Sequence, residues 1–375
     1  MKTWDIFCRV IDNYGDIGVC WRLARQLVDE HGLDVRLWVD EIAALQQIWP
    51  EARRVDSQEL AGVKVCIWAE DFRVDRVAEV VIEAFACHLP EAYEKAILQV
   101  KPAPLWINLE YLSAESWVEG CHQLSSINPQ NGLKKTFYFP GFNAKTGGLL
   151  RECGLLERRH SFAEGNGREH FLSRLGLAPG SEHSLLISLF SYENAAIESL
   201  LQAWSQSPVA VVCLVPEGKA LLSVNRFLAE PLAVGKGCTL GSLTLQTIPF
   251  LTQSDYDLLL WSCDINFVRG EDSFVRAQWA AKPFIWHIYP QDDQAHMVKL
   301  DAFLDKYTAL MPPELAELVR RLWQAWNRGE DTADPWQKLM AHHLDWREHN
   351  QIWSDNLGAA PDLATNLVHF CQKLL

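Results

Sequence analysis

Short apolar runs alternate with amphipathic stretches along the chain, and this alternation predicts strands and helices in turn. The clearest unit opens the sequence. An apolar run at 4–11 predicts a strand, a turn follows at 12–17, and apolar residues at helical spacing through Val28 predict a helix that ends at Gly32. The apolar run 35–39 predicts the next strand. This order is a βαβ unit, so we expect a parallel sheet.

The same pattern continues to residue 290, with one interruption. Further strands are expected at 63–68, 80–85, 105–109, 184–190, 209–215, 243–248, 256–260, 265–268 and 283–286. A polar, glycine-containing stretch at 151–180 separates two groups of strands. The pattern therefore predicts an α/β chain with two doubly wound domains.

The domain boundaries follow from that interruption. We expect an N-terminal Rossmann-like domain at 1–155, a linker at 156–182, a C-terminal Rossmann-like domain at 183–358 and a C-terminal helix at 359–375 that crosses back to the first domain. Doubly wound domains bind ligands at the carboxyl ends of their strands. Two such domains that face each other across a cleft form the GT-B architecture of many glycosyltransferases, and in outline that of a two-domain dehydrogenase.

Composition narrows the class of protein. The 375 residues are 49% hydrophobic and 22% charged, which suits a globular chain of two domains. No apolar run approaches the roughly 20 residues of a membrane helix, and Asp5 interrupts any signal-peptide core. We therefore expect a cytoplasmic protein that binds no membrane. A net charge of −14 disfavours nucleic acid as a partner.

The turn after the first strand carries two acids and two glycines. A dinucleotide-binding loop has the pattern G-x-G-x-x-G, but here Gly15 and Gly18 are present and Asn13 replaces the first glycine. Asp40 could mimic the ribose-binding acid, yet Asp16 would repel a pyrophosphate. A pair of carboxylates, Asp12 and Asp16, would instead suit a cationic acceptor. The alternative is structural, with Asp12 forming the turn and Asp16 capping the helix.

A second motif follows the expected strand 265–268. Arg269 can bind a diphosphate with its planar guanidinium, and Gly270 lets a ligand approach the backbone. The helix that starts here presents free N–H groups, and Ser273 adds a hydroxyl. The alternative is that Asp272 or Ser273 merely caps the helix while Glu271 is solvated.

Aromatic and amide side chains follow two other strands of the second domain. Phe190 and Tyr192 follow one strand, and Phe250 and Gln253 follow another. Phe250 could stack on a base, and Gln253 could bond to its edge. Each aromatic taken alone is better explained by core packing, but the group as a whole predicts a site for a nucleoside diphosphate.

These motifs together resemble the EarP family, protein-arginine rhamnosyltransferases that modify bacterial translation elongation factor P. The matching stretches are 4–8, 12–19, 21–27, 106–115, 140–142, 146–152 and 269–273. The resemblance covers essentially the whole chain. It implies an inverting GT-B glycosyltransferase with dTDP-β-L-rhamnose as donor and an arginine of elongation factor P as acceptor.

The resemblance also implies residue roles. Catalysis would involve Asp12, Asp16 and Glu271. Donor binding would involve Tyr14, Gly15, Phe190, Tyr192, Phe250, Gln253, Arg269, Gly270, Asp272 and Ser273. No cofactor and no metal are expected, because Arg269 and the helix start would stabilise the leaving diphosphate.

Arginine as acceptor explains the need for two acids. A guanidinium keeps its proton to a pKa of about 12.5 or higher, so a carboxylate must accept the proton as the new bond forms. We assign this role to Asp16 and the orientation of the guanidinium plane to Asp12. Glu271 would hold a sugar hydroxyl or orient Arg269.

Three alternative functions stay open on the residues alone. A GT-B enzyme with a small-molecule acceptor would need no protein partner. A sugar-nucleotide-binding regulator would bind the donor without depending on Asp12 or Asp16. A dehydrogenase is the third alternative.

Overall fold

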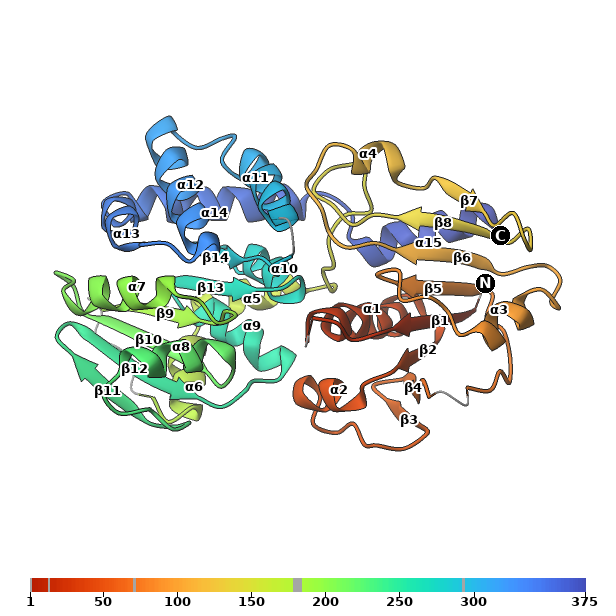
Figure 1. Cartoon of the computed structure of the whole chain (residues 1–375), viewed down its shortest axis with the longest axis horizontal. Helices are drawn as coiled ribbons and strands as arrows, with labels where there is room; N and C mark the ends of the chain where they lie inside the picture. Colours follow the sequence, from red (N-terminus) through yellow and green to blue (C-terminus); the bar gives the residue numbers. More distant parts are fainter. Residues whose placement is uncertain (1, 13, 70–71, 178–183, 292–293) are drawn as a thin grey trace. The chain divides into compact units, whose positions relative to one another are not determined.

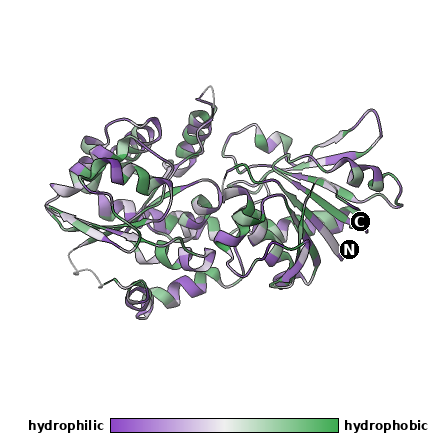
Figure 2. Cartoon of the chain, turned by 60° about the horizontal axis from the view of Figure 1, so that its bottom comes forward, coloured by the Kyte–Doolittle hydropathy of each residue, from purple (hydrophilic) through white to green (hydrophobic). Residues whose placement is uncertain are grey.

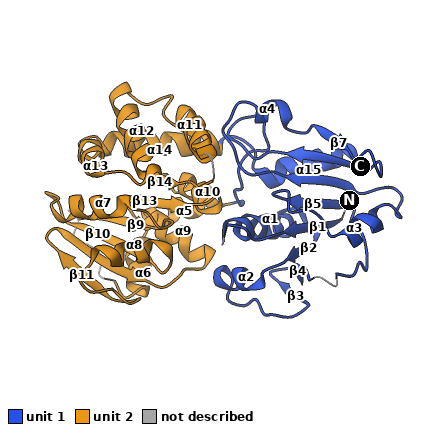
Figure 3. Cartoon of the chain, in the orientation of Figure 1, with its two compact units in different colours: residues 1–153, 359–375 blue, residues 154–358 orange. Residues whose placement is uncertain are grey.

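The computed structural model describes residues 2–12, 14–69, 72–177, 184–291 and 294–375. The chain divides into two compact units, coloured separately in Figure 3. Unit 1 contains residues 1–153 and 359–375, and unit 2 contains residues 154–358.

The described part of unit 1 forms an eight-stranded sheet. Its strands are β1 (Thr3–Cys8), β2 (Asp34–Val39), β3 (Ser57–Leu60), β4 (Val63–Ile67), β5 (Val80–Ala84), β6 (Leu105–Leu109), β7 (Ser125–Ile127) and β8 (Lys134–Tyr138). Their order is β3-β4-β2-β1-β5-β6-β8-β7. The six central strands are parallel, and β3 and β7 pair antiparallel at the edges. Without the edges, the order is that of a Rossmann sheet, and it reverses between β1 and β5.

The helices of unit 1 cover both faces of this sheet. They are α1 (Gly15–His31), α2 (Ile42–Ile48), α3 (Glu91–Ile97), α4 (Val118–Cys121) and α15 (Leu363–Leu374). Neighbouring residues of β1 point to opposite faces. Phe7 therefore contacts Tyr93 of α3, with ring centroids 4.8 Å apart, while Cys8 interacts with Cys20 of α1. Gly32 ends α1 in the left-handed conformation, as the sequence predicts.

Residues 359–375 belong to unit 1, to which the sequence analysis expected the C-terminal helix to return. Helix α15 packs beside α1 (Figure 1). Asp362 caps α15 by accepting from the N–H of Thr365, and it also accepts from the side chain of Gln26 in α1. Tyr138 of β8 contacts Phe370, with centroids 5.5 Å apart.

Unit 2 repeats the Rossmann arrangement. Its strands are β9 (Leu185–Leu189), β10 (Val211–Pro216), β11 (Gly237–Leu240), β12 (Leu243–Ile248), β13 (Ile265–Arg269) and β14 (Phe284–His287). Their order is β11-β12-β10-β9-β13-β14, and β11 is the antiparallel edge. This order reverses between β9 and β13. Figure 2 shows hydrophobic colour along many of the strands and hydrophobic and hydrophilic residues mixed along the helices.

The helices of unit 2 are α5 (Leu155–Glu164), α6 (Gly167–Arg174), α7 (Ala196–Ser205), α8 (Lys219–Phe227), α9 (Gln253–Ser262), α10 (Asp272–Trp279), α11 (Ala295–Tyr307), α12 (Pro313–Arg328), α13 (Ala333–Met340) and α14 (His343–Gly358). Much of the aromatic content is core packing here. Phe274 stacks on Trp286 with ring centroids 3.8 Å apart, and the rings of Trp204 and Trp336 pack edge to face with centroids 5.4 Å apart. Within the described residues, no helix is long and apolar enough to cross a bilayer.

Two expectations from the sequence are wrong. The run 256–260, predicted as a strand, lies inside helix α9, which Thr252 caps by accepting from the N–H of Asp255. The expected linker at 156–182 contains α5 and α6 in its described part and belongs to unit 2. Its residues 178–182, and residue 183 where the second domain was expected to begin, lie outside the described residues. Buried Arg159 of α5 donates to Trp279 O and Ser354 Oγ, which holds this helix on unit 2.

Candidate active-site residues in each unit

The point where strand order reverses is the place at which doubly wound sheets bind ligands. In unit 1 Asp12 and residues 14–16 follow β1 at this point. In unit 2 Phe190 and Tyr192 follow β9, and Arg269 ends the neighbouring strand β13. The predicted residues therefore lie at the binding edge of each sheet. Asp12, Tyr14, Gly15 and Asp16 belong to unit 1, and all the other predicted site residues belong to unit 2.

Asp16 is almost fully buried, with 2% of its surface exposed. Its Oδ2 accepts from the backbone N–H groups of Ile11 and Asp12, both at 2.8 Å. Its Oδ1 accepts from the hydroxyl of Tyr111 at 3.1 Å. A carboxylate offers about four acceptor positions, and the described residues use three of them, which leaves one direction at Oδ1. Asp16 is the second residue of α1, whose N-cap is Tyr14, so it does not cap the helix as the structural alternative supposed.

Burial raises the pKa of Asp16 above its usual value, because desolvation disfavours the charged form, and the neighbouring Asp12 raises it further. The backbone N–H groups of Asp12 and Ile11 and the Tyr111 hydroxyl act in the opposite direction without cancelling the effect. A carboxylate with a raised pKa is a better proton acceptor than an exposed one.

Asp12 is half-buried, and Gly15 lies against it. The N–H of Gly15 donates to the carbonyl of Asp12 at 2.6 Å, which closes the turn. A methyl group on Gly15 would stand 2.7 Å from Asp12 Oδ2, so only glycine leaves this carboxylate in place. Tyr14, half-buried, lies between them in sequence. The turn thus presents a more accessible acid beside a buried one.

Arg269 is the central cation of the site in unit 2. It is 6% exposed, and its guanidinium lies 4.5 Å from the ring centroid of Phe190 and 4.9 Å from that of Tyr192. Its Nη1 is buried and has no hydrogen-bond partner among the described residues. An unsatisfied buried donor on a charged group is costly. The rings of Phe190 and Tyr192 therefore fix the plane of the Arg269 guanidinium, and its Nη1 can donate a hydrogen bond to an anion.

Helix α10 starts directly after Arg269. Gly270 adopts a left-handed conformation with φ 62°, and its carbonyl accepts from Trp286 Nε1 at 2.8 Å. Glu271 occupies the N-cap position, but its side chain does not cap the helix. Neither Asp272 nor Ser273 is the cap, contrary to the structural alternative. Asp272 and Ser273 are half-buried in the first turn, where N–H groups suit an anion.

Phe250 and Gln253 join the same site. Phe250 contacts Phe190, with ring centroids 6.5 Å apart. Gln253 Nε2 donates to Asp272 Oδ2 at 3.2 Å, which ties the start of α9 to the start of α10. The eight predicted donor-binding residues of unit 2 therefore lie on the segments that follow β9, β12 and β13.

Several side chains at these sites were not predicted from the sequence. Tyr111 bonds to Asp16 and stacks on Phe85 at 4.4 Å. Lys219 places its Nζ 5.8 Å from the ring centroid of Tyr192. The Gly-Lys pair after strand β10, at the start of a helix, was the available signal for Lys219. Tyr111 carried no local signal, because its partner lies 95 positions away.

His287 is the other unpredicted residue. It pairs with Arg269 across β13 and β14 and meets Tyr192 at 5.2 Å. Burial, with the charge of Arg269, lowers the pKa of His287 to about 3, so the ring is neutral. Its Nδ1 is buried without a hydrogen-bond partner in the described structure. Among the described residues of this site, both Arg269 Nη1 and His287 Nδ1 are buried polar atoms without a hydrogen-bond partner.

Comparison with known proteins agrees with this geometry. Residues 4–372 match the family model described as Elongation-Factor P (EF-P) rhamnosyltransferase EarP. The protein-arginine rhamnosyltransferase of Pseudomonas putida is 50% identical, over 100% of this chain and 99% of that protein. A solved structure described as the structural basis for EarP-mediated arginine glycosylation of translation elongation factor EF-P is 38% identical, with a TM-score of 0.71 and full coverage of both chains.

A more distant structure shares the fold alone. A UGT transferase from Siraitia grosvenorii in complex with UDP is 10% identical, covers 99% of both chains and has a TM-score of 0.52. The α/β GT-B fold class with two Rossmann-like units, predicted from the sequence, is confirmed, and the dehydrogenase alternative is wrong. The chain belongs to the EarP family of protein-arginine rhamnosyltransferases, which are glycosyltransferases.

Proposed function

We propose that the chain transfers L-rhamnose from dTDP-β-L-rhamnose to an arginine of translation elongation factor P, with inversion at the sugar carbon. One observation supports the binding of a nucleotide sugar in unit 2. Nη1 of Arg269 is buried without a hydrogen-bond partner among the described residues, and the rings of Phe190 and Tyr192 hold its guanidinium in place. A diphosphate is the ligand chemistry that satisfies it. The acceptor is proposed from the family and from the two acids of unit 1.

The donor occupies unit 2 in this proposal. Arg269 and the first turn of α10, with Gly270, Asp272 and Ser273, bind the diphosphate and stabilise its charge as the glycosidic bond breaks. Phe250 and Gln253 take the base. Glu271 holds a sugar hydroxyl or orients Arg269. Lys219, exposed at the start of α8 with its Nζ 5.8 Å from the ring centroid of Tyr192, adds a second positive charge near that ring.

The acceptor guanidinium meets the acids of unit 1. Half-buried Asp12 binds it and fixes its plane. Tyr14 and Gly15, next to this acid in the turn, keep the donor-binding role that the resemblance implies. Asp16 accepts the proton as the nitrogen bonds to the sugar carbon, through the acceptor direction that its three hydrogen bonds leave open. Its raised pKa supports this role. The electron pair of the broken bond leaves with the nucleoside diphosphate.

The experiment is transfer in a purified system. The chain is incubated with dTDP-β-L-rhamnose and elongation factor P, and intact-mass spectrometry is expected to show a gain of one deoxyhexose. Replacing the acceptor arginine with lysine removes the gain, and a chelator leaves the rate unchanged. No mass gain on elongation factor P, or turnover of donor at the same rate without it, would refute the proposed acceptor.

A further inference from the structure

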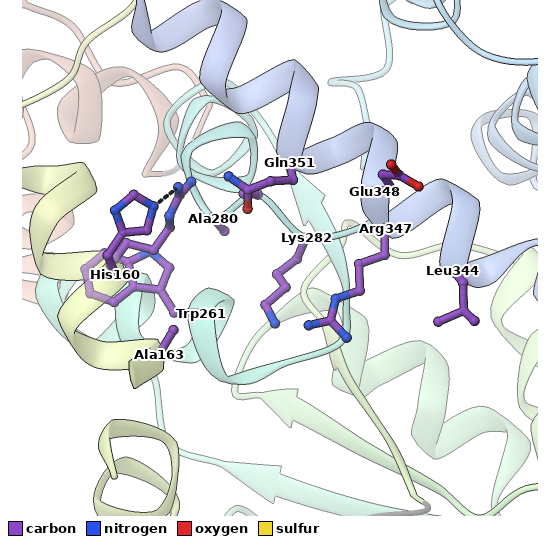
Figure 4. Close-up of a pocket in the computed structure, with 11 residues that line it drawn as sticks. His160, Ala163, Trp261, Ala280, Lys282, Leu344, Arg347, Glu348 and Gln351 are labelled. Carbon is purple, nitrogen blue, oxygen red and sulfur yellow. Dashed lines mark hydrogen bonds between the residues drawn. The ribbon is translucent and has the colours of Figure 1, made fainter. Parts of the chain in front are cut away.

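A cavity of about 500 Å³ opens in unit 2 away from the donor residues. Its walls come from α5, the end of α9, the connection from α10 to β14, and α14 (Figure 4). Because Lys282 precedes the parallel strand β14, the cavity lies at the amino-terminal edge of the sheet. Arg269 and Glu271 lie at the opposite, carboxyl-terminal edge. The cavity is therefore separate from the proposed donor site.

Two cationic side chains enter this cavity. Figure 4 shows the ammonium group of Lys282 and the guanidinium of Arg347 directed toward the same space, while the carboxylate of Glu348 points away from them. Among the described residues, neither cation has a carboxylate within 4.0 Å. Asp264, which attracts Lys282 from further away, is already bound by Arg168 at 3.3 Å and by the N–H of Leu186 at 2.9 Å.

Lys282 is half-buried and Arg347 is exposed at the mouth of the cavity, and both carry positive charge. Burial lowers the pKa of Lys282, and the charge of Arg347 lowers it further. Two like charges brought together without a counter-charge repel each other. The chain has 48 acidic and 34 basic residues, so carboxylates are abundant, yet none pairs with these two cations in the described structure. An anion in the cavity would remove this cost.

The third cation of the cavity has a structural role. Arg159 Nη1 donates to Trp279 O at 2.9 Å, which satisfies a carbonyl at the end of α10, and to Ser354 Oγ at 3.0 Å. Its Nη2 lies 2.9 Å from His160 Nε2. These bonds account for Arg159 and His160 without a ligand. No comparable bonds account for Lys282 and Arg347 among the described residues.

The rest of the wall is apolar. Trp261, Ala163 and Leu344 line the cavity on either side of the cations (Figure 4). The volume falls in the range of small-molecule sites, roughly 300–1,000 Å³. We propose that this cavity binds a phosphorylated small molecule, with its phosphate on Lys282 and Arg347 and its planar or apolar part against Trp261. Nothing in this proposal depends on the identity of the donor sugar or of the acceptor.

Calorimetric titration tests the site. All chains carry Arg269→Gln, so that the donor site does not account for binding. Inorganic pyrophosphate and AMP serve as probes for the charge and for the planar part. Both are expected to bind saturably to the parent chain, and Lys282→Gln with Arg347→Gln weakens both at least tenfold. Trp261→Ala weakens AMP and leaves pyrophosphate unchanged.

The matched control is Lys338→Gln, an exposed lysine of α13 in the same unit that pairs with Asp334 at 2.8 Å. It is expected to leave both affinities unchanged. The proposal is overturned if neither probe binds saturably to the parent chain. It is also overturned if Trp261→Ala binds AMP as well as the parent does, or if the double variant binds both probes as well as the parent does.

Thermal unfolding separates binding from a structural role. Without anions, the double variant is expected to unfold at the same temperature as its parent or higher, because the substitutions remove a like-charge contact. Pyrophosphate raises the unfolding temperature of the parent by several degrees and leaves that of the double variant unchanged. A lower unfolding temperature without anions, together with an equal response to pyrophosphate, would overturn the proposal.

Discussion

Asp16 shows how one carboxylate can be both rigid and basic. Three donors hold its oxygens, and its burial keeps water away. Asn at this position can keep the same bonds, because its carbonyl accepts from the two N–H groups and its amide donates to the Tyr111 oxygen. The substitution therefore separates charge from structure, which few changes in a catalytic turn do.

Asp16→Asn is expected to abolish transfer while keeping the fold, with a loss of about 10²–10⁴-fold in rate. The pKa of Asp16 is raised in the folded state, so the folded chain binds this proton more tightly than the unfolded chain. Wild type therefore loses stability as the pH rises through the folded pKa, and the variant does not. Thermal unfolding measured from pH 4 to pH 7 should therefore show the stability of Asp16→Asn rise relative to that of wild type.

The control for that series is Asp29→Asn, an exposed acid on the same helix. It should change neither the rate nor the pH dependence of stability. Transfer that survives in Asp16→Asn would make Asp16 an anchor of the turn and move the role of base to Asp12.

Lys219 and Arg269 are the two cations near the Tyr192 ring, and substituting each tests the donor site. Lys219 is exposed and lies 5.8 Å from that ring, so its attraction for a diphosphate is screened by solvent. Lys219→Gln is expected to weaken donor binding by about 2- to 10-fold, less at high salt, with kcat unchanged. Arg269→Lys keeps the charge but loses the planar fork, and about 10- to 100-fold of donor affinity should go with it.

Donor titrations by calorimetry at two salt concentrations measure both variants. Lys236→Gln, an exposed lysine of unit 2 for which no ion pair is described, is the control for net charge. Equal losses for Lys219→Gln at low and high salt would contradict an electrostatic role.

At the scale of helices and strands, the sequence predicted buried parallel strands well and short polar elements poorly. β1, β9 and β13 are apolar runs buried on both faces, which is the signal of a parallel strand. The antiparallel edge strands β3, β7 and β11 are largely exposed and carry no such run. They were missed because edge pairing depends on the neighbouring strand and little on their own side chains.

Helix α9 shows a different failure. The run Tyr256–Leu260 has five residues and only one acid, too short for its period to distinguish a helix from a strand. The capping signal Thr252-x-x-Asp255 stood directly before it and marks a helix start. Helices α5 and α6 were mistaken for a linker because their few buried residues include Arg159, a charged side chain whose partners are distant in sequence.

The candidate site was predictable where chemistry is local. A strand followed by a glycine turn and an acid, or by Arg-Gly and a helix start, places its side chains at a known edge of the sheet. Tyr111 and His287 were missed because each joins the site from another strand, Tyr111 after β6, two strands away from β1, and His287 in β14, beside β13, and only the sheet order brings them there.

At the start of α15, Asp362 joins two elements. It accepts from the N–H and the hydroxyl of Thr365 and from Gln26 of α1. Asp362→Ala removes the cap and leaves Gln26 with one partner fewer, so unit 1 should lose about 1–2 kcal/mol of unfolding free energy. Urea unfolding followed by circular dichroism measures this loss. Gln372→Ala, exposed on the same helix, should cost under 0.5 kcal/mol, roughly the range of surface substitutions.

At the scale of the whole molecule, the two units differ in how the chain builds them. Unit 2 is one continuous segment, 154–358, and holds Arg269 with the other donor residues of the proposal. Unit 1 needs both ends of the chain, because residues 359–375 complete it. Leu363, Leu367 and Cys371 are fully or almost fully buried on α15. Loss of this helix would expose the apolar surface of unit 1 that it covers.

A chain that ends at Gly358 is therefore expected to lose one activity and keep another. Unit 2 remains intact, so dTDP should bind with an affinity within about twofold of wild type, while transfer to elongation factor P is lost because the turn with Asp12 and Asp16 stands on a destabilised sheet. A chain that ends at Gln372 lacks only exposed residues and serves as control. Calorimetry with dTDP and intact-mass analysis of the acceptor measure the two activities. Equal loss of dTDP binding and transfer would contradict the view that unit 2 folds and binds its ligand without unit 1.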